Sequence, residues 1–481
     1  MAPVRYRHII LLLALLAALL PSPARAAERA IMVGPGGDYA RLADALAAAP
    51  AGATIELLPG VQQGQWTIAR PVTLRGRHGA VLDGAGSGTL LTIAAPGVTI
   101  TGLTIQNSGR SLLNDDAAIL ITADDARIEG NRLHDIHHAI YVKDGAARVV
   151  IRNNTIVGRA ELIREDRGNG IHLWDAPDAL VELNTVLHVR DGVYVGFAPR
   201  SVFRDNVFRE VRYGIHFMYA DDNLFEHNIF EQAEAGAALM YSSRITLRRN
   251  VFAHSRSSRA YGLLLQECDE VLAEDNLLLN NSRALFVNVS RDGVFRRNRF
   301  VGNDLAVQIY AGAERNRFEA NDFVANLQLV MTDAAGSNIW EGNYWDEYRG
   351  LDMDRDGAGD TPFATGDPLG LLLSDHPQLR LFSFSPAVQA LGAAERAFPL
   401  LELPEVRDPR PALAPVALAA GALGYDSAPR APRPLFSLLA LGMLLAAGAL
   451  LALARRPHLS VAAKRAYEHQ EATLTPEACH D

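Results

Sequence analysis

Residues 202–208 read VFRDNVF, and residues 224–230, twenty-two positions later, read LFEHNIF. The central asparagine of this motif recurs along most of the chain, at Asn131, Asn154, Asn184, Asn206, Asn228, Asn250, Asn276, Asn298, Asn321 and Asn343. Most of the gaps are 22 or 23 residues; gaps of 30 and 26 place insertions around residues 159–168 and 255–259. A fixed period of this length is typical of a solenoid, in which each repeat stacks on its neighbours.

A second apolar marker runs in phase with the asparagines, at Ile171, Val193, Ile215, Ala237, Leu263, Leu285, Val307 and Leu329. Around it, apolar residues alternate with polar ones, as in residues 214–218 (GIHFM), which indicates short strands with one buried face. Leucine-rich repeats have a similar period, but their units are dominated by leucine, whereas these use Val, Ile and Phe. We therefore predict an all-β fold, a right-handed parallel β-helix with coils of about 22 residues. The recurrent asparagines are expected to stack inside it as a hydrogen-bonded ladder.

Both ends of such a solenoid need covering. At the N-terminal end, residues 39–49 predict a helical cap, with Asp38 as its N-cap and residues 54–57 as the first coil. At the other end the repeats stop after Trp345.

The flanking segments predict an exported, membrane-tethered protein. Three cationic residues, an apolar run from Ile9 to Leu20 and the small-x-small pattern at residues 24–26 form a secretory signal. Residues 435–454 contain no charge and are long enough to span a bilayer, and the cations after them favour a cytoplasmic tail. The predicted order is a signal peptide (1–26), the capped β-helix (27–365), a partly helical docking segment (366–399), a Pro-rich linker (400–434), a transmembrane helix (435–454) and a cytoplasmic tail (455–481). The location is then the periplasm, tethered to the inner membrane.

The formal net charge of −9 provides no basic stripe for phosphates, which argues against a nucleic-acid partner.

Aligning the coils places soft metal ligands on one outward face. One outward column reads Tyr141, His172, Tyr194, His216, Ala238, Leu264 and Phe286, and the column two residues further reads Lys143, Trp174, Gly196, Met218, Met240, Gln266 and Asn288. Coils stack about 4.8 Å apart, so Met218 and Met240 are neighbours beside His216, with His172 two coils away. Imidazole and thioether ligands suit copper, Cu(I) especially. The alternative is an ordinary contact surface, which Met residues also serve. His134, His137 and His138 lie near an early turn, where one could add a ligand.

An acidic loop follows the repeats. Asp352, Asp354, Asp356 and Asp360 occupy positions 1, 3, 5 and 9 of an arrangement with Gly357 at position 6. Alternating carboxylates around a glycine turn suit calcium in a structural role, although Phe363 stands where a bidentate Glu is usual. A solvated acidic turn is the alternative.

Enzymes built on this architecture need clustered carboxylates, or a groove that combines a base with a cation. The acidic doublets here, such as Asp124–Asp125 and Asp221–Asp222, are typical of turns, and neighbouring residues in a strand would point to opposite faces. The sequence therefore favours a non-enzymatic role. The alternative is an envelope carbohydrate-active protein: a polysaccharide lyase, hydrolase or epimerase.

The segment after the repeats narrows the assignment. Residues 338–346 (NIWEGNYWD), the acidic loop, and the stretches 376–380 (HPQLR), 385–388 (SPAV) and 394–399 (AERAFP) resemble the NosD family, within the wider group of carbohydrate-binding and sugar-hydrolase β-helix domains. NosD proteins are periplasmic maturation proteins of nitrous-oxide reductase.

That resemblance implies an assembly factor rather than an enzyme. Its implied partners are an ABC transporter (a membrane permease and a cytoplasmic ATPase), a small lipoprotein copper chaperone, and nitrous-oxide reductase, whose copper–sulfur centre it helps to assemble. The resemblance adds weight to copper binding at His172, His216, Met218 and Met240, although only the coil alignment indicates these four residues. A C-terminal span and basic tail depart from the soluble form of the family.

Overall fold

The computed structural model describes residues 29–111, 113–310, 312–332, 337–365 and 406–415, together with the single residues Ser385, Ala390 and Ala394. The chain divides into two compact units, Met1–Tyr425 and Asp426–Asp481, and every described residue belongs to the first.

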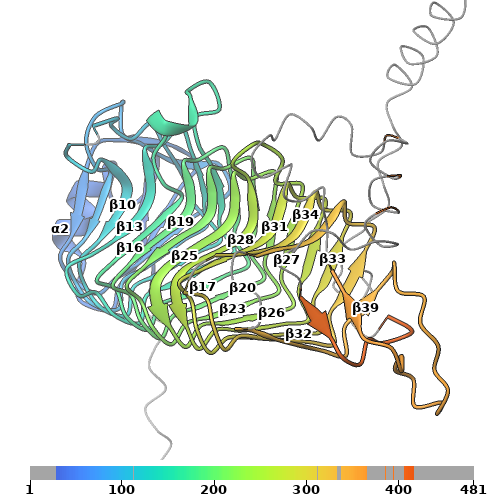
Figure 1. The fold of residues 1–481 in the computed structure, drawn as a ribbon. Coiled ribbons are helices and arrows are strands. Elements are labelled where there is room, and N and C mark those ends of the chain that lie inside the picture. The colour runs from blue at the N-terminus through green and yellow to red at the C-terminus, as the bar shows by residue number, and fades with distance from the viewer. Residues whose placement is uncertain are drawn as a thin grey trace, which may run out of the picture. The chain divides into compact units, whose positions relative to one another are not determined.

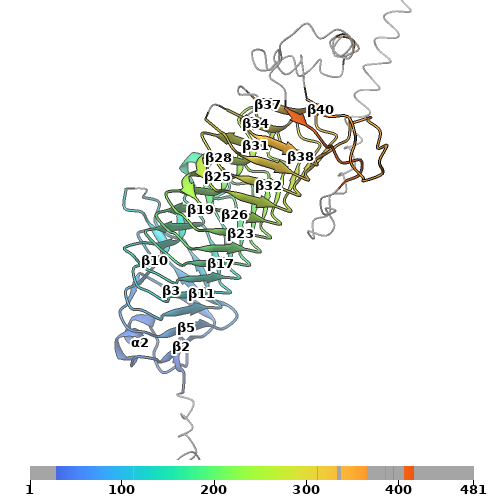
Figure 2. The same ribbon diagram turned by 60° about the horizontal axis from the view of Figure 1, so that its bottom comes forward.

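Three parallel sheets form the walls of a β-solenoid, and their strands follow one another in chain order from the end near β2 to the end near β39 (Figures 1 and 2). Sheet A contains fourteen strands: β1 (Ile31–Val33), β2 (Thr54–Leu57), β5 (Thr73–Gly76), β8 (Thr99–Thr101), β11 (Arg127–Glu129), β14 (Val150–Arg152), β17 (Leu180–Glu182), β20 (Val202–Arg204), β23 (Leu224–Glu226), β26 (Thr246–Arg248), β29 (Leu272–Glu274), β32 (Val294–Arg296), β35 (Arg317–Glu319) and β38 (Ile339–Glu341).

Sheet B contains thirteen strands: β3 (Gly60–Gln63), β6 (Ala80–Asp83), β9 (Thr104–Gln106), β12 (Arg132–His134), β15 (Thr155–Val157), β18 (Thr185–Leu187), β21 (Val207–Arg209), β24 (Ile229–Glu231), β27 (Val251–Ala253), β30 (Leu277–Leu279), β33 (Arg299–Val301), β36 (Asp322–Val324) and β39 (Tyr344–Trp345). Sheet C contains twelve: β4 (Trp66–Ile68), β7 (Leu91–Ile93), β10 (Ala117–Ile121), β13 (His138–Val142), β16 (Ile171–Trp174), β19 (Asp191–Gly196), β22 (Tyr213–Met218), β25 (Ala235–Ser243), β28 (Tyr261–Asp269), β31 (Arg283–Asn288), β34 (Leu305–Ile309) and β37 (Gln328–Thr332). The predicted all-β solenoid with coils of about 22 residues is confirmed.

The core is built from equivalent inward-facing positions that stack from one coil to the next. Phe203 on β20 lies over Phe225 on β23 with ring centroids 4.9 Å apart, and Phe208 lies over Phe230 at 5.3 Å. All four rings are fully buried. Because side chains alternate along each strand, one face of the strand is buried inside the solenoid and the other points outward, as the sequence pattern predicted.

The asparagine ladder is also confirmed, at the turn between sheets A and B. The Asn206 side-chain amide donates to Asn228 Oδ1 at 3.0 Å and to the Val181 carbonyl at 2.9 Å, while Asn228 Oδ1 also accepts the Asn206 backbone N–H at 3.1 Å. The same pattern runs from Asn131 to Asn343. Each buried Asn side chain thus finds acceptors for both of its amide hydrogens. Its oxygen also accepts the backbone N–H of the ladder asparagine in the preceding coil.

A short helix, α2 (Leu42–Ala48), lies beside β1 and β2. It is shorter than the predicted range 39–49, and its N-cap residue is Arg41, so the assignment of Asp38 as the N-cap was wrong. Asp38 instead accepts the backbone N–H of Met32 at 2.9 Å, which holds the turn before the helix. Leu42 and Ala45 are buried, and the capping of the first coil by this helix stays a prediction.

The C-terminal end of the solenoid is joined by a distant segment. Strand β41 (Arg407–Asp408) pairs antiparallel with β40 (Phe363–Ala364), although it falls within the predicted linker 400–434. Asp408 is fully buried, and its Oδ2 accepts the side-chain amide of Asn343 at 3.0 Å and the indole N–H of Trp345 at 3.2 Å. A carboxylate thereby ends the asparagine ladder.

The predicted signal peptide (1–26), the transmembrane helix (435–454) and the tail (455–481) lie outside the described residues, as does nearly all of the docking segment (366–399). Within the described part of the chain, no helix is both long enough and apolar enough to cross a membrane.

Candidate metal centre

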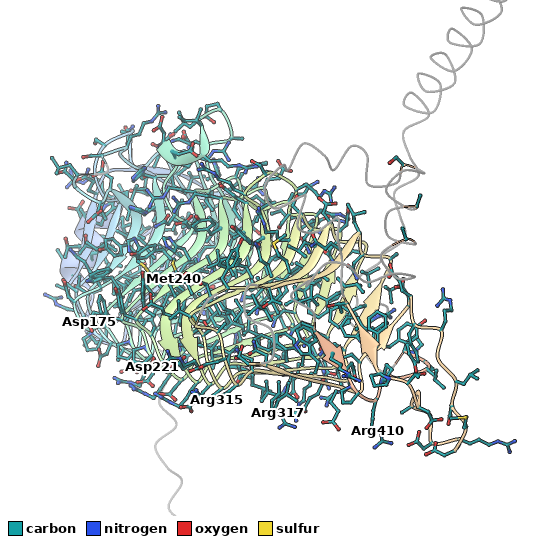
Figure 3. All side chains as sticks on the ribbon, in the orientation of Figure 1. Asp175, Asp221, Met240, Arg315, Arg317 and Arg410 are labelled. Carbon is teal, nitrogen blue, oxygen red and sulfur yellow. The ribbon has the colours of Figure 1, made fainter. Side chains whose placement is uncertain are left out.

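The two outward columns form on sheet C as the alignment predicted. Strands β22 and β25 pair so that Met218 lies opposite Met240 and His216 opposite Ala238, while β19 places Gly196 beside Met218. Met218, Met240 and His216 are half-buried, so their side chains are held by neighbours but remain open to solvent. Met240 is labelled in Figure 3. The structure therefore places these three residues at neighbouring outward positions on two successive coils.

A buried carboxylate supports His216 from beneath. Asp191, at the start of β19, is fully buried and lies 3.1 Å from His216 Nδ1 through its Oδ2. It also accepts two hydrogen bonds from the Arg212 guanidinium, at 2.8 and 2.6 Å. Burial acts to raise the pKa of Asp191, but the hydrogen bonds from His216 and Arg212 outweigh it and hold that pKa below its ordinary value. The site thus contains an ionised carboxylate behind an imidazole.

His172 is separated from this group by an aromatic ring. Its ring centroid lies 4.6 Å from that of Tyr194, and Tyr194 lies 4.9 Å from His216, so Tyr194 stands between the two imidazoles. Tyr141 stacks on the other side of His172 at 4.3 Å. Burial, with the nearby Arg190 charge, lowers the pKa of His172 to about 4, so the ring is neutral at physiological pH. The structure does not bring His172 to the two methionines.

His137 and His138, which the sequence suggested as possible additional ligands near an early turn, are both buried. The His138 ring centroid lies 4.6 Å from that of His137 and 5.4 Å from that of His172. His138 Nδ1 accepts the backbone N–H of Asn169 at 3.1 Å, and burial, with His172 nearby, lowers its pKa to about 2. These histidines belong to the packed wall beside the candidate centre.

Four exposed aromatic side chains, here called the aromatic ridge, border the methionines: Trp174, Phe197, Tyr219 and Tyr241. Successive ring centroids lie 5.2, 5.3 and 5.0 Å apart, and the last three rings are stacked. Tyr219 and Tyr241 directly follow Met218 and Met240 in the chain. The coil alignment included Trp174 but stopped one position short of Phe197, Tyr219 and Tyr241, although the 22-residue spacing of these three was available as a signal.

In the acidic loop, ligand oxygens of Asp352, Asp354 and Asp356 lie within 4.8 Å of one another. Asp360 is not part of this group, because its carboxylate accepts the backbone N–H of Met353. Arg410, labelled in Figure 3, pairs with Asp356. Three of the four predicted oxygen ligands therefore come together, beside one competing cation.

Two of the acidic doublets are engaged by arginines at turns. Arg148 binds Asp124 and Asp125, and Arg244 binds Asp221 and Asp222 one coil below it. Their position at turns agrees with the sequence prediction, and their ion pairs tie successive coils together.

Comparison with solved structures shows the fold. The A-module of the mannuronan C-5 epimerase AlgE6 of Azotobacter vinelandii matches 62% of this chain and 92% of its own length, with a TM-score of 0.52 and 12% sequence identity. At that identity the likeness concerns the parallel β-helix alone.

Comparison with families and curated relatives is more specific. The family model described as "Periplasmic copper-binding protein (NosD)" matches residues 152–350. A "Probable ABC transporter binding protein NosD" of Pseudomonas aeruginosa is 42% identical over 375 residues, covering 74% of this chain and 87% of the relative. A protein of the same name from Stutzerimonas stutzeri is 41% identical over 373 residues, covering 73% and 85%. This chain belongs to the NosD family.

Proposed function

We propose that this protein is a non-enzymatic assembly factor of the periplasm, which handles copper for the copper–sulfur centre of nitrous-oxide reductase. Three findings support the proposal. The family is described as periplasmic and copper-binding, the relatives are named as probable ABC transporter binding proteins, and residues with soft ligand atoms occupy neighbouring positions on one outer face. In this role it docks on a transporter permease with its cytoplasmic ATPase and receives copper from a lipoprotein chaperone. Residues 435–454 then tether it to the inner membrane.

The observation that carries the proposal is the in-register pair Met218 and Met240 beside His216. Thioethers are weak ligands for hard cations and good ligands for Cu(I), and one imidazole with two thioethers can supply three-coordinate Cu(I). All three are half-buried on a rigid wall, so a bound ion would be held and yet remain reachable by a partner. This combination suits transfer rather than permanent storage.

The carbohydrate-active alternative rests on less. The similarity to the epimerase shows the fold only. Among the described residues, only the acidic loop brings together three side chains with carboxyl, imidazole or thiol groups, and Asp354 and Asp356 in that loop are exposed. The doublets Asp124–Asp125 and Asp221–Asp222 bind arginines.

The test is Cu(I) binding by the full mature chain under reducing conditions, measured by competition with a chromogenic Cu(I) chelator. The combined variant His216→Ala, Met218→Ala, Met240→Ala is expected to lose the tight site that the parent shows. A matched control, Leu264→Ala with Gln266→Ala, changes the same two columns one coil further along and is expected to bind as the parent does. Binding that is absent in the parent, or equal in the parent and the combined variant, would overturn copper handling at this face.

We also propose that calcium binds the acidic loop in a structural role, through Asp352, Asp354 and Asp356, with Asp360 turning toward the ion on binding. Titration calorimetry with CaCl₂ is expected to show one binding event that Asp352→Asn combined with Asp354→Asn abolishes. Because Arg410 already pairs with Asp356, Arg410→Ala is expected to strengthen binding. No heat of binding in the parent would leave a solvated acidic turn.

A further inference from the structure

We propose that Asp191 is the positioning residue of the copper site: it fixes the His216 imidazole in the tautomer that presents Nε2 to the metal, and it makes His216 the single imidazole ligand. This inference rests on the proposed function and deepens it, because it states which atom binds and what orients that atom.

The direction of the hydrogen bond follows from its partners. An ionised carboxylate can only accept hydrogen bonds, so His216 Nδ1, 3.1 Å from Asp191 Oδ2, must carry the proton. In a neutral imidazole the other nitrogen, Nε2, then holds the free lone pair. The bond also fixes the plane of the ring, so the lone pair points in one direction.

Arg212 keeps the carboxylate in its accepting form. Its guanidinium donates two hydrogen bonds to Asp191, at 2.8 and 2.6 Å, and lies over the Tyr213 ring at 4.5 Å. A fully buried Asp would otherwise be costly to ionise, and the paired arginine offsets that cost. Arg190, whose Nε lies 3.9 Å from Asp191 Oδ2, adds a second positive charge nearby.

The two neighbouring histidines, His138 and His172, have different surroundings from those of His216. His138 Nδ1 accepts the Asn169 backbone N–H, so in the neutral ring the proton lies on Nε2, and that nitrogen cannot bind a metal. The Nε2 of His172 is buried, and its ring is enclosed by Tyr141 and Tyr194. Of these three imidazoles, His216 alone combines a carboxylate on Nδ1 with a half-buried side chain beside two thioethers.

A carboxylate behind a ligating histidine raises the basicity of the ligand nitrogen and fixes its orientation, and removing it typically lowers metal affinity roughly 10–100-fold. In Asp191→Asn the side chain keeps its shape but gains a donor. If the side-chain oxygen of the new asparagine accepts from Arg212, its NH₂ group faces His216 Nδ1 and donates to it. The imidazole proton then moves to Nε2, which removes the lone pair that would bind the metal.

The experiment has two independent readouts on the full mature chain. With ¹⁵N-labelled histidine, the ring nitrogen shifts of His216, assigned by comparison with His216→Gln, report the tautomer without any metal. Cu(I) competition then reports affinity for the parent, Asp191→Asn, and the control Asp205→Asn, which alters an exposed Asp–His pair with His227 at the turns between sheets A and B.

The expected result is an Nδ1–H tautomer in the parent, a shift toward Nε2–H in Asp191→Asn, and a Cu(I) affinity lower by roughly 10–100-fold in that variant but not in the control. An Nε2–H tautomer in the parent overturns the inference even if Asp191→Asn fails to fold. Tight Cu(I) binding that is equal in parent and Asp191→Asn overturns the inference and leaves the proposed function standing. An Nδ1–H tautomer with no Cu(I) binding in the parent overturns both the proposed function and the ligand role of His216.

Discussion

His172 and His138 are held neutral inside the wall of sheet C, chiefly because burial lowers their pKa values to about 4 and about 2 from an ordinary value of 6.5. The unfolded chain therefore binds more protons than the folded chain at any pH between the folded pKa and 6.5. The stability that these groups contribute is present above pH 6.5 and is lost as the pH falls below it.

For His172 alone, this linkage predicts that the free energy of unfolding is roughly 2 kcal/mol lower at pH 5 than at pH 7. Urea unfolding at the two pH values measures the difference. In His172→Phe, which keeps a ring between Tyr141 and Tyr194 but cannot be protonated, the difference is expected to shrink by a similar amount. An unchanged difference in this variant would mean that His172 is protonated as easily in the folded protein as in the unfolded chain.

At this same scale, the sequence predicts the metal ligands better than their support. His216, Met218 and Met240 follow from strand alternation and a 22-residue period, because both depend only on spacing. Asp191 reaches His216 from the adjacent coil, and Arg212 approaches from four residues before His216 in the same coil. Both contacts depend on side-chain conformations, which spacing does not specify. Likewise, nothing in the local sequence distinguishes the buried His138 from an exposed residue at a turn.

At the scale of elements, the strands were predictable and some of their ends were not. Phe197, Tyr219 and Tyr241 of the aromatic ridge have φ values of 54°, 53° and 53°, in the left-handed region that Gly or Asn usually occupies. That backbone costs roughly 1–2 kcal/mol per residue, and stacking of the rings returns about 0.5–1.5 kcal/mol per pair. Aromatic residues at these positions give no turn signal, so these three members of the ridge were missed.

The ladder asparagines show the opposite case. Each one bonds only to the coils next to it, and the same contacts repeat from coil to coil. An interaction that is local and repeated in every coil requires the same residue at a fixed interval, so the ladder could be predicted from the sequence. Asp408 makes the same kind of contact once, from 65 residues beyond Asn343 and within a Pro-rich segment, and leaves no periodic signal in the sequence.

At the scale of the whole solenoid, each coil contacts only its neighbours, so stability is close to a sum of coil and interface contributions. The interior is protected by stacking on both sides, and the exposed ends are where unfolding begins. The end near β39 therefore depends on what covers it. In the structure that cover includes the pairing of β40 with β41 and the buried Asp408.

Asp408→Ala removes one acceptor from three buried donors: the backbone and side-chain N–H groups of Asn343 and the indole N–H of Trp345. Each unsatisfied donor costs about 1–3 kcal/mol, so the last coil is expected to lose most of its protection against amide hydrogen exchange. Because coupling is between neighbours, the loss should fade toward Asn298 and be absent near Phe203. Arg407→Ala, an exposed change on the same strand, is the control. Loss of protection along the entire solenoid would show that it unfolds as one cooperative unit, whereas no loss at β38 and β39 would show that the ladder ends stably without Asp408.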